Sequence, residues 1–458
     1  MNESPAESSS RRDFLATAAA AALAGSALSA CAAEGSKAVA THAGAPAHGG
    51  GLFRAPAIPK VRIGYVGAGL QGSGHIANLL KIPGCEIVAV CDIVPAKVER
   101  VQKEVEAAGF KQPKGFSKGP TDYERLCQED LDLVYTATPW EFHVPVMLAA
   151  MKNGKHAATE VPMGYHTEDI WSLVETSEKL QKHCVMMENC CYGRTEMTIL
   201  HMVRKGVFGE LLHCEGGYLH DLRAIKFENA NEGLWRRAHA RQRNCNLYPT
   251  HGLGPVAQCM NINRGDRFDY LVSMSSKTRG LELYAKEHFP DSDPRRSEKF
   301  KLGDVNVSLI RTVNGCTIYL GHNCDSARPY SRINTVQGTK AIATGYPDRI
   351  YIEGVSPNDE WEPIEKYTAQ WDHPLWKREE EKSKGAGHGG MDFLEDLRLI
   401  ENLNKGEPLD QDVYDGAAWS VMGPLSERSV AENGRPQDVP DFTRGAWKTR
   451  PPLEILGV

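Results

Sequence analysis

A glycine-rich turn between a buried strand and a helix constrains the fold more than any other stretch of this chain. The residues VRIGYV at 61–66 predict a strand, and the run GAGLQG at 67–72 follows with the spacing G-x-G-x-x-G. In that context Gly67 makes the turn, Gly69 lets the backbone approach a pyrophosphate, and Gly72 lets the helix pack on the strand. The positive end of the helix would face the phosphate charge.

A second strand completes this unit. EIVAVCD at 86–92 is apolar and ends at Asp92. A carboxylate at that place accepts hydrogen bonds from ribose hydroxyls and repels a 2′-phosphate, which favours NAD over NADP. The alternative is a glycine turn that binds no ligand, with Asp92 as a helix-entry residue. Strand, turn, helix, strand and acid together predict an NAD site.

Short apolar runs alternate with amphipathic stretches over the rest of the first half. Further buried strands are predicted by LDLVYTAT at 131–138, HAATEVP at 156–162 and VMMEN at 185–189. Strands that are buried on both faces and separated by helices are typical of a doubly wound parallel sheet. We therefore expect an α/β fold with a Rossmann domain over 59–187.

The second half of the chain has a different texture. ELLHCEGGYLH at 210–220 predicts a long strand, and two alternating runs within 307–322 meet at Asn314-Gly315, a strong hairpin signal. We expect an α+β domain over 188–458 that binds substrate and mediates oligomerisation, with an open, mostly antiparallel sheet and C-terminal helices. Residues 221–247 are polar without a clear period and predict a long loop.

Residues 1–31 resemble an export signal. Arg11-Arg12 precede an alanine-rich, weakly hydrophobic run, which is typical of twin-arginine export, and LSAC at 28–31 is similar to a lipobox that ends at Cys31. The alternative is simple signal cleavage near the alanines. Residues 32–58, rich in Ala, Gly, Ser and His, predict a flexible linker. We expect a protein of the periplasm or cell envelope that is lipid-anchored through Cys31.

The composition argues against several classes of protein and site. A formal charge of -6 and a pI near 6.3 provide no basic face for nucleic acid. No HExxH or paired CxxC signature occurs, so no metal site is predicted. The twelve cysteines lack the spacing of a disulfide framework, and we predict buried free thiols.

With these features the chain resembles the glucose–fructose oxidoreductase and inositol dehydrogenase superfamily over about residues 60–430. Proteins of that superfamily carry Glu-Lys-Pro at the end of the fifth strand, where the lysine meets the substrate hydroxyl beside the nicotinamide. Glu160-Val161-Pro162 occupies that position here. His251 matches a histidine that leads a helix in the superfamily, but Leu247 replaces an aspartate that often lies four residues before it.

A narrower resemblance is to glycoside hydrolase family 109, the NAD-dependent α-N-acetylgalactosaminidases. The segments that carry it are TPWEFH (138–143), TEVPMG (159–164), ENCCYGR (188–194), EGGYLHDLR (215–223), WRRAH (235–239) and NLYPTHGLGP (246–255). Besides the glycines, the resemblance implies NAD contacts at Leu70, Gln71, Asp92, Trp140, Glu141, Phe142, His143, Glu160, Val161 and Asn189. It implies sugar contacts at Tyr218, Arg236, Tyr248, Pro249, Thr250, His251 and Tyr330.

The resemblance also implies a redox route for removing terminal α-linked N-acetylgalactosamine. Oxidation at C3 makes the neighbouring C2 proton acidic, the group on C1 leaves by elimination, water adds, and the hydride returns to C3 with net retention. Tyr192, Tyr248 and His251 lie in the segments expected to carry the proton transfers. Our hypothesis places His251 and Tyr248 near C3 and the leaving group, Tyr192 near C2, and Arg236 on the polar groups of the sugar. Cys190 and Cys191 are interpreted as packing residues.

Two other functions stay open on these residues. One is an NAD-dependent sugar or cyclitol dehydrogenase, against which the missing lysine counts. The other is a sugar-binding protein that holds the cofactor without turnover, because a Tyr-x-x-His pair is often only a helix entrance with a core histidine. The superfamily also often dimerises through an exposed sheet face, which implies a homodimer.

Overall fold

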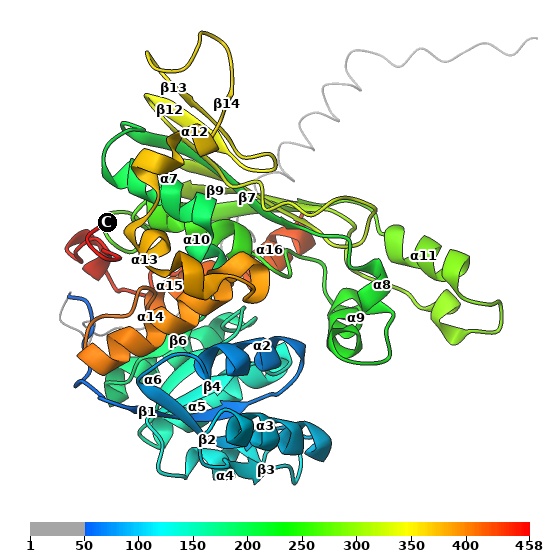
Figure 1. Cartoon of the computed structure of the whole chain (residues 1–458). Helices are drawn as coiled ribbons and strands as arrows, with labels where there is room; N and C mark the ends of the chain where they lie inside the picture. The colour runs from blue at the N-terminus through cyan, green and yellow to red at the C-terminus, as the bar shows by residue number, and fades with distance from the viewer. Residues whose placement is uncertain (1–50) are drawn as a thin grey trace, which may run out of the picture. The chain divides into compact units, whose positions relative to one another are not determined.

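The computed structural model describes residues 51–458, and its first domain is a parallel sheet with helices on both faces (Figure 1). The six strands lie in the order β3-β2-β1-β4-β5-β6 and all pairs are parallel. The strands are β1 (Val61–Val66), β2 (Cys85–Cys91), β3 (Lys114–Phe116), β4 (Leu133–Thr136), β5 (His156–Thr159) and β6 (Cys184–Met186). The helices are α2 (Leu70–Leu79), α3 (Pro95–Ala107), α4 (Tyr123–Cys127), η1 (Trp140–Phe142), α5 (His143–Lys152) and α6 (Thr167–Leu180). The predicted doubly wound fold is confirmed, and its strand order reverses between β1 and β4, where such sheets bind ligands.

The second domain is built on a nine-stranded sheet in the order β14-β13-β12-β11-β7-β10-β9-β8-β15. Only the pair β7–β10 is parallel, so the predicted mostly antiparallel sheet is confirmed. Its strands are β7 (Leu211–Leu219), β8 (Phe268–Ser275), β9 (Asn306–Thr312), β10 (Thr317–Asn323), β11 (Thr335–Gly338), β12 (Ala341–Thr344), β13 (Arg349–Ile352), β14 (Glu362–Pro363) and β15 (Gln437–Asp438). The predicted hairpin joins β9 to β10, and Gly315 supplies the positive φ of 96° that its turn needs.

The helices of the second domain surround this sheet, and several of them lie between it and the first domain (Figure 1). They are η2 (Asn189–Tyr192), α7 (Arg194–Arg204), α8 (Arg223–Lys226), α9 (Glu232–Gln242), α10 (Thr250–Cys259), α11 (Gly280–His288), η3 (Pro294–Ser297), α12 (Glu365–Trp371), α13 (Pro374–Ser383), η4 (Gly387–Gly390), α14 (Met391–Lys405), α15 (Val413–Ser420), α16 (Met422–Ala431) and η5 (Ala446–Lys448). In Figure 1 the orange helix α14 lies between the two domains, where it contacts both α2 and η2.

The prediction of a long loop over 221–247 is wrong, because this segment contains α8 and α9. The buried positions of α9 do follow a helical period, but two of them are the polar residues Arg236 and His239. A search for apolar periodicity therefore cannot detect the helix. Glu232 pairs with Arg236 one turn later, at 2.7 Å, and supports it locally.

The linker predicted for 32–58 is too long at its C-terminal end. Ala55 is buried, and the Ile58 amide donates to the carbonyl of Leu403 on α14 at 3.0 Å. These residues belong to the folded protein because their apolar side chains reach its core. The export and lipidation predictions for 1–31 lie outside the described residues.

The cysteines behave as predicted in the described part of the chain. All eleven that the structure describes are free thiols, and only Cys316 is not fully buried. Burial raises the pKa of thiols such as Cys85 to about 12, so they are unreactive. Across residues 51–458, no helix combines the length and the apolar character that crossing a bilayer requires.

Helix α10 approaches strand β7 so closely that only glycine fits between them. A Cβ atom on Gly252 would lie 2.1 Å from the amide nitrogen of Gly217, and one on Gly216 would lie 2.1 Å from the carbonyl oxygen of Gly252. This contact fixes the first turn of α10, and with it His251, directly over the strand.

We expect Gly252→Ala to lower the free energy of unfolding by about 1–3 kcal/mol, because the added methyl group forces helix and strand apart. Urea denaturation measures the change. The matched control is Gly74→Ala in α2, where nothing lies within 4 Å of the added atom. That change should raise stability by about 0.5–1 kcal/mol through helix propensity. Equal effects of the two substitutions would contradict the packing argument.

Candidate functional site

The glycine turn after β1 forms a cradle with one open position. A Cβ atom on Gly67 would lie 2.7 Å from the carbonyl oxygen of Ala137, and one on Gly72 would lie 2.0 Å from that of Gly67. Gly67 also has a φ of 92°. By contrast, nothing lies within 4 Å of a Cβ atom on Gly69. The outer two glycines are thus required by packing, while Gly69 keeps space open at the start of α2, where a pyrophosphate can approach the helix.

Asp92 ties this cradle to the end of β2. Its two carboxylate oxygens accept hydrogen bonds from the amides of Ala68 and Val94, both at 2.9 Å. Each oxygen keeps a second lone pair that can accept from a ribose hydroxyl. Leu70 is 74% exposed beside the open Gly69, so its side chain is available to a ligand lying on the turn.

The loops after β4 and β5 are held together by His143. Its Nδ1 lies 2.8 Å from the carbonyl oxygen of Pro162, and its Nε2 lies 2.9 Å from that of Thr138. Both ring nitrogens therefore face backbone carbonyl oxygens, so a cofactor contact of His143 would use other atoms of the residue. Its neighbours Trp140, Glu141 and Phe142 form the single turn η1 at the edge of the crevice.

Glu160 and Val161 lie at the end of β5, on the floor of the crevice. Glu160 Oε1 lies 2.6 Å from His75 Nε2 on α2, and Oε2 accepts from the Val161 amide at 3.1 Å. Val161 is buried. The position where the superfamily places its lysine is thus an apolar part of the floor.

Asn189 and Gln71, both predicted cofactor contacts, share a partner that the sequence analysis missed. Asp392, at the start of α14, accepts from the Asn189 amide at 2.6 Å and from the Gln71 amide at 3.4 Å. His388 Nδ1 lies 2.7 Å from the same carboxylate. Although burial opposes ionisation, His388 lowers the pKa of Asp392 to about 2. The carboxylate is therefore charged and holds three elements together.

The predicted sugar contacts form an aromatic cluster on the opposite wall. The ring centroid of Tyr248 lies 4.4 Å from that of Tyr218, 4.7 Å from that of His251 and 5.7 Å from that of Trp140. The Arg236 guanidinium lies 5.2 Å from the centre of the Tyr248 ring. The structure therefore brings five of the predicted residues together, across the boundary between the two domains.

The remaining predicted sugar contacts lie around this cluster. Tyr330 is at its rim, 37% exposed, with its ring 6.2 Å from that of Tyr218. Pro249 and Thr250 are buried where α10 begins, directly before His251.

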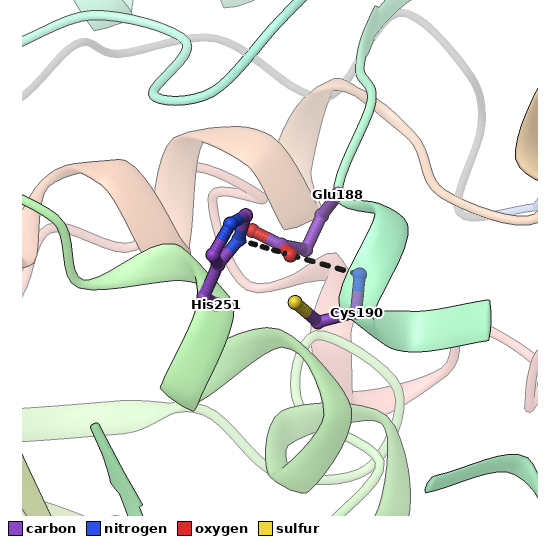
Figure 2. A group of neighbouring side chains, drawn as sticks. All are labelled: Glu188, Cys190 and His251. Atoms are coloured by element: carbon purple, nitrogen blue, oxygen red, sulfur yellow. Dashed lines mark hydrogen bonds and ion pairs between the residues drawn. The ribbon is translucent and has the colours of Figure 1, made fainter. Parts of the chain in front are cut away.

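A buried polar interaction beside the cluster joins Glu188 to His251 (Figure 2). Glu188 Oε1 lies 2.7 Å from His251 Nδ1 and also accepts from the Cys190 amide at 3.1 Å. Although complete burial opposes ionisation, the interaction with His251 lowers the pKa of Glu188. An ionised carboxylate on Nδ1 fixes the tautomer of His251 and leaves Nε2 as the nitrogen for proton transfer. Sequence reasoning missed Glu188; its position at the end of a predicted buried strand, beside Asn189, was the available signal.

Glu188, Cys190 and His251 also offer ligand atoms within 4.8 Å of one another, a spacing compatible with a metal ion. The hydrogen bonds among these three residues argue for a hydrogen-bonded group in place of a metal site. Glu188 accepts from the other two residues, and burial raises the pKa of the Cys190 thiol well above its ordinary value. A metal ligand would have to be a thiolate. We interpret the group as a carboxylate–histidine dyad with a packed thiol.

The hypothesis that Tyr192 acts as a base near C2 is contradicted by its surroundings. Its hydroxyl donates to Asp410 at 3.2 Å, and Asp410 in turn pairs with Arg398 of α14. Burial and this carboxylate raise the pKa of Tyr192 well above its ordinary value. A buried phenol bonded to a carboxylate is a poor base, so Tyr192 supports the site from behind.

Comparisons with known proteins agree with this two-part site. Residues 61–188 match the model of the oxidoreductase family with an NAD-binding Rossmann fold, and residues 192–449 match that of the glycosyl hydrolase 109 C-terminal domain. A glycosyl hydrolase family 109 protein of Shewanella amazonensis is 48% identical over 97% of this chain and 99% of its own length. One of Solibacter usitatus is 51% identical over 86% of this chain and 90% of its own length.

Solved structures share the fold at much lower identity. A levoglucosan dehydrogenase in complex with NADH and levoglucosan aligns with a TM-score of 0.65 at 17% identity, covering 83% of this chain and all of its own. A scyllo-inositol dehydrogenase of Lactobacillus casei with bound NAD(H) and scyllo-inositol aligns with a TM-score of 0.60 at 14% identity, covering 83% of this chain and 99% of its own. The family match and the open glycine cradle together identify the crevice of the Rossmann domain as an NAD site.

We expect Gly69→Ala to lower the NAD content of the purified protein while leaving its unfolding free energy within about 0.5 kcal/mol of the parent, since the added methyl group occupies only the phosphate space. Gly72→Ala is the comparison, because its methyl group clashes inside the protein. It should lose stability as well as NAD. Chromatography of the released nucleotide and urea denaturation give the two readouts, and full NAD content in Gly69→Ala would contradict the assignment.

Proposed function

The chain belongs to glycosyl hydrolase family 109, and from this premise we propose that it removes terminal α-linked N-acetylgalactosamine from glycans with NAD as a catalytic cofactor. The observation that carries the proposal is the Glu188–His251 dyad beside an aromatic cluster that spans the NAD domain and the second domain. Such a cluster offers apolar ring faces to a sugar, and the dyad offers a base.

In the proposed cycle, NAD supplies reversible removal of hydride from sugar C3. The C3 hydroxyl loses its proton as the hydride leaves, and the resulting ketone makes the C2 proton acidic. When a base removes that proton, the electron pair forms the C1–C2 double bond and the C1–O bond breaks with its electrons. The departing aglycone oxygen takes a proton, water adds to C1 and gives up a proton in its place, and the proton returns to C2; the hydride would return to C3 from bound NADH. The net change is hydrolysis with retention.

The residues of this chain supply the proton transfers and the positioning. His251 accepts protons at Nε2, and the ionised Glu188 behind it stabilises the imidazolium that forms. Arg236 lies against the Tyr248 ring and is well placed to hold the acetamido oxygen of the sugar. Glu188 is fully buried against His251, so it serves as the partner of a base and not as the exposed acid of a two-carboxylate glycosidase.

The buried Val161 bears on the alternative function. A dehydrogenase that releases its cofactor in each turnover benefits from one fixed lysine at this position, which transfers the proton of the substrate hydroxyl. This chain lacks that lysine. The apolar floor is compatible with a cofactor that stays bound and returns its hydride.

We further propose that the protein is exported, lipid-anchored through Cys31, and homodimeric. The apolar side chains Met274 and Leu309, on neighbouring strands β8 and β9, are 66% and 55% exposed, which supports contact with a second copy through this sheet. Sedimentation of the purified protein at the mass of a single chain would contradict the dimer. Failure to label the protein with a radioactive fatty acid in cells would contradict the anchor.

The central test is hydrolysis in heavy water. The purified protein should carry bound NAD and cleave nitrophenyl α-N-acetylgalactosaminide without accumulating NADH. The released sugar should carry deuterium at C2, as nuclear magnetic resonance measures directly, because that proton is lost and regained. Full activity after the dinucleotide is removed would disprove the redox route, and stoichiometric NADH release would favour the dehydrogenase.

We expect Glu188→Gln to lower kcat by at least about 100-fold, because an amide neither stabilises the imidazolium nor enforces the tautomer of His251. KM and NAD content should change little. Steady-state kinetics with the same nitrophenyl substrate measure the effect. The matched control is Glu381→Gln, whose side chain is exposed on α13 and should have parent activity. If both variants kept the parent kcat, the dyad would have no role in the reaction.

A further inference from the structure

Glu188, Cys190 and His251 together offer the donor atoms that zinc prefers. One carboxylate oxygen, one sulfur and one imidazole nitrogen lie within 4.8 Å of one another. Zinc takes carboxylate, thiolate and imidazole ligands, whereas magnesium and calcium take oxygen ligands. In Figure 2 the Cys190 side chain points toward the Glu188–His251 pair, so the three donors converge on one space. We call these three residues the donor cluster.

The donor cluster is held by two elements that pack tightly against each other. Glu188 is the N-cap of η2, Cys190 lies within η2, and His251 lies in the first turn of α10. A Cβ atom on Gly254 of α10 would lie 2.9 Å from Glu188 Cγ. Donors that are fixed by packing lose little freedom when they bind an ion, which favours affinity.

One carboxylate oxygen in the donor cluster is unused. Glu188 Oε1 contacts His251 and accepts from the Cys190 amide, but Oε2 is buried and makes no full hydrogen bond within residues 51–458. The Thr250 hydroxyl interacts with this carboxylate, but not in the geometry of a full hydrogen bond. A buried polar atom without a partner indicates a place for water or an ion. Oε2 can therefore bind a metal ion while Oε1 keeps the Cys190 amide.

Only small movements are needed to form the site. Tetrahedral zinc with bonds of about 2.0–2.3 Å holds its ligand atoms roughly 3.3–3.6 Å apart. His251 Nδ1 lies 2.7 Å from Glu188 Oε1, so imidazole and carboxylate must separate by less than about 1 Å. The His251 side chain is 12% exposed while that of Glu188 is fully buried, so an ion would enter past His251. Water can supply the fourth ligand from that side.

The charges around the donor cluster suit a divalent cation. The Glu188 carboxylate and a Cys190 thiolate would balance the two positive charges of the ion, which a buried site requires. The cation nearest to Cys190 within the described residues is Arg332, and it pairs with Glu196. Its charge is thereby compensated and opposes metal binding little.

We propose that zinc binds the donor cluster and switches the Glu188–His251 dyad off. The ion acts as an inhibitor and not as a resident cofactor, because without it the three residues form the hydrogen-bonded group described above. On binding, the Cys190 thiol gives up its proton to solvent and its sulfur coordinates the ion together with Glu188 Oε2. The inhibition rests on the proposed function, whereas the binding does not.

Coordination at Nδ1 explains why the base would be lost. The proton on His251 Nδ1 has to leave before the metal can bind there, and the neutral ring then carries its proton on Nε2. A protonated Nε2 cannot accept a proton from the substrate. His251 also loses its hydrogen bond to Glu188, which stabilises the imidazolium in the metal-free protein.

Binding is measured on the full chain with NAD bound, by competition with a chromogenic zinc chelator. We expect Cys190→Ala, which removes one of the three protein ligands, to weaken zinc binding at least about tenfold. Cys190→Ser keeps the size of the side chain and serves if the alanine variant does not fold. The matched control is Cys191→Ala, which removes the neighbouring buried thiol outside the donor cluster and should bind zinc as tightly as the parent.

Inhibition is measured with nitrophenyl α-N-acetylgalactosaminide. Each variant is compared with its own activity in the absence of zinc, so any loss of folded protein cancels. Parent activity should fall as zinc occupancy rises and return when EDTA removes the ion. The zinc concentration for half inhibition should rise at least about tenfold in Cys190→Ala and stay unchanged in Cys191→Ala. Magnesium at the same concentration should have no effect, since it does not favour sulfur ligands.

The possible failures can be told apart. If the parent binds no zinc, or if Cys190→Ala binds it as tightly as the parent, the site is disproved. If zinc binds through Cys190 but activity persists at full occupancy, the switch is disproved. If the parent with NAD bound cleaves no glycoside, the proposed function fails, and the chelator competition still decides whether the zinc site exists.

Discussion

The buried ion cluster between α2 and α14 is the interaction on which the arrangement of the site depends. His75 lies between Asp396, at 2.9 Å, and Glu160, at 2.6 Å. Burial alone would lower the pKa of His75, but the two carboxylates raise it well above its ordinary value, so the ring is charged. Removing one member would leave an unpaired charge in the protein interior, which is costly. The cluster therefore locks the phosphate-binding helix, the end of β5 and the helix α14 into one unit.

A second constraint sets His251 against that unit. Asp392 lies one turn before Asp396 on α14 and holds Asn189, the first residue of η2. Glu188, the residue before it, reaches His251, whose place over β7 is fixed by the contact of Gly252 with Gly217. His251 and the cofactor floor are thus connected through buried contacts, although they come from different domains.

The sequence predicted well what depends on neighbouring residues. The strand–glycine–helix unit and the hairpin at Asn314-Gly315 both appear as expected. Local patterns carry such features because each glycine or apolar residue serves the element in which it stands. The resemblance to the family added the sugar-side residues, which no periodicity identifies.

What the sequence could not predict depends on contacts between distant segments. Helix α9 was missed because two of its buried positions, Arg236 and His239, are polar, so its buried face has no apolar period. Glu188 is 63 positions from His251 along the chain, and nothing near either residue specifies the pair. Tyr192 was misassigned for the same reason: its motif matches the family, but its hydroxyl points to Asp410, more than 200 positions away.

In the proposed cycle a hydride that leaves C3 must return to it, which imposes a geometric demand that ordinary dehydrogenases do not face. Sugar and dinucleotide must keep their relative position through elimination and water addition, although the bond to the aglycone has been broken. A site assembled on one rigid, buried set of ion pairs suits that demand, because the cofactor floor and His251 cannot shift independently.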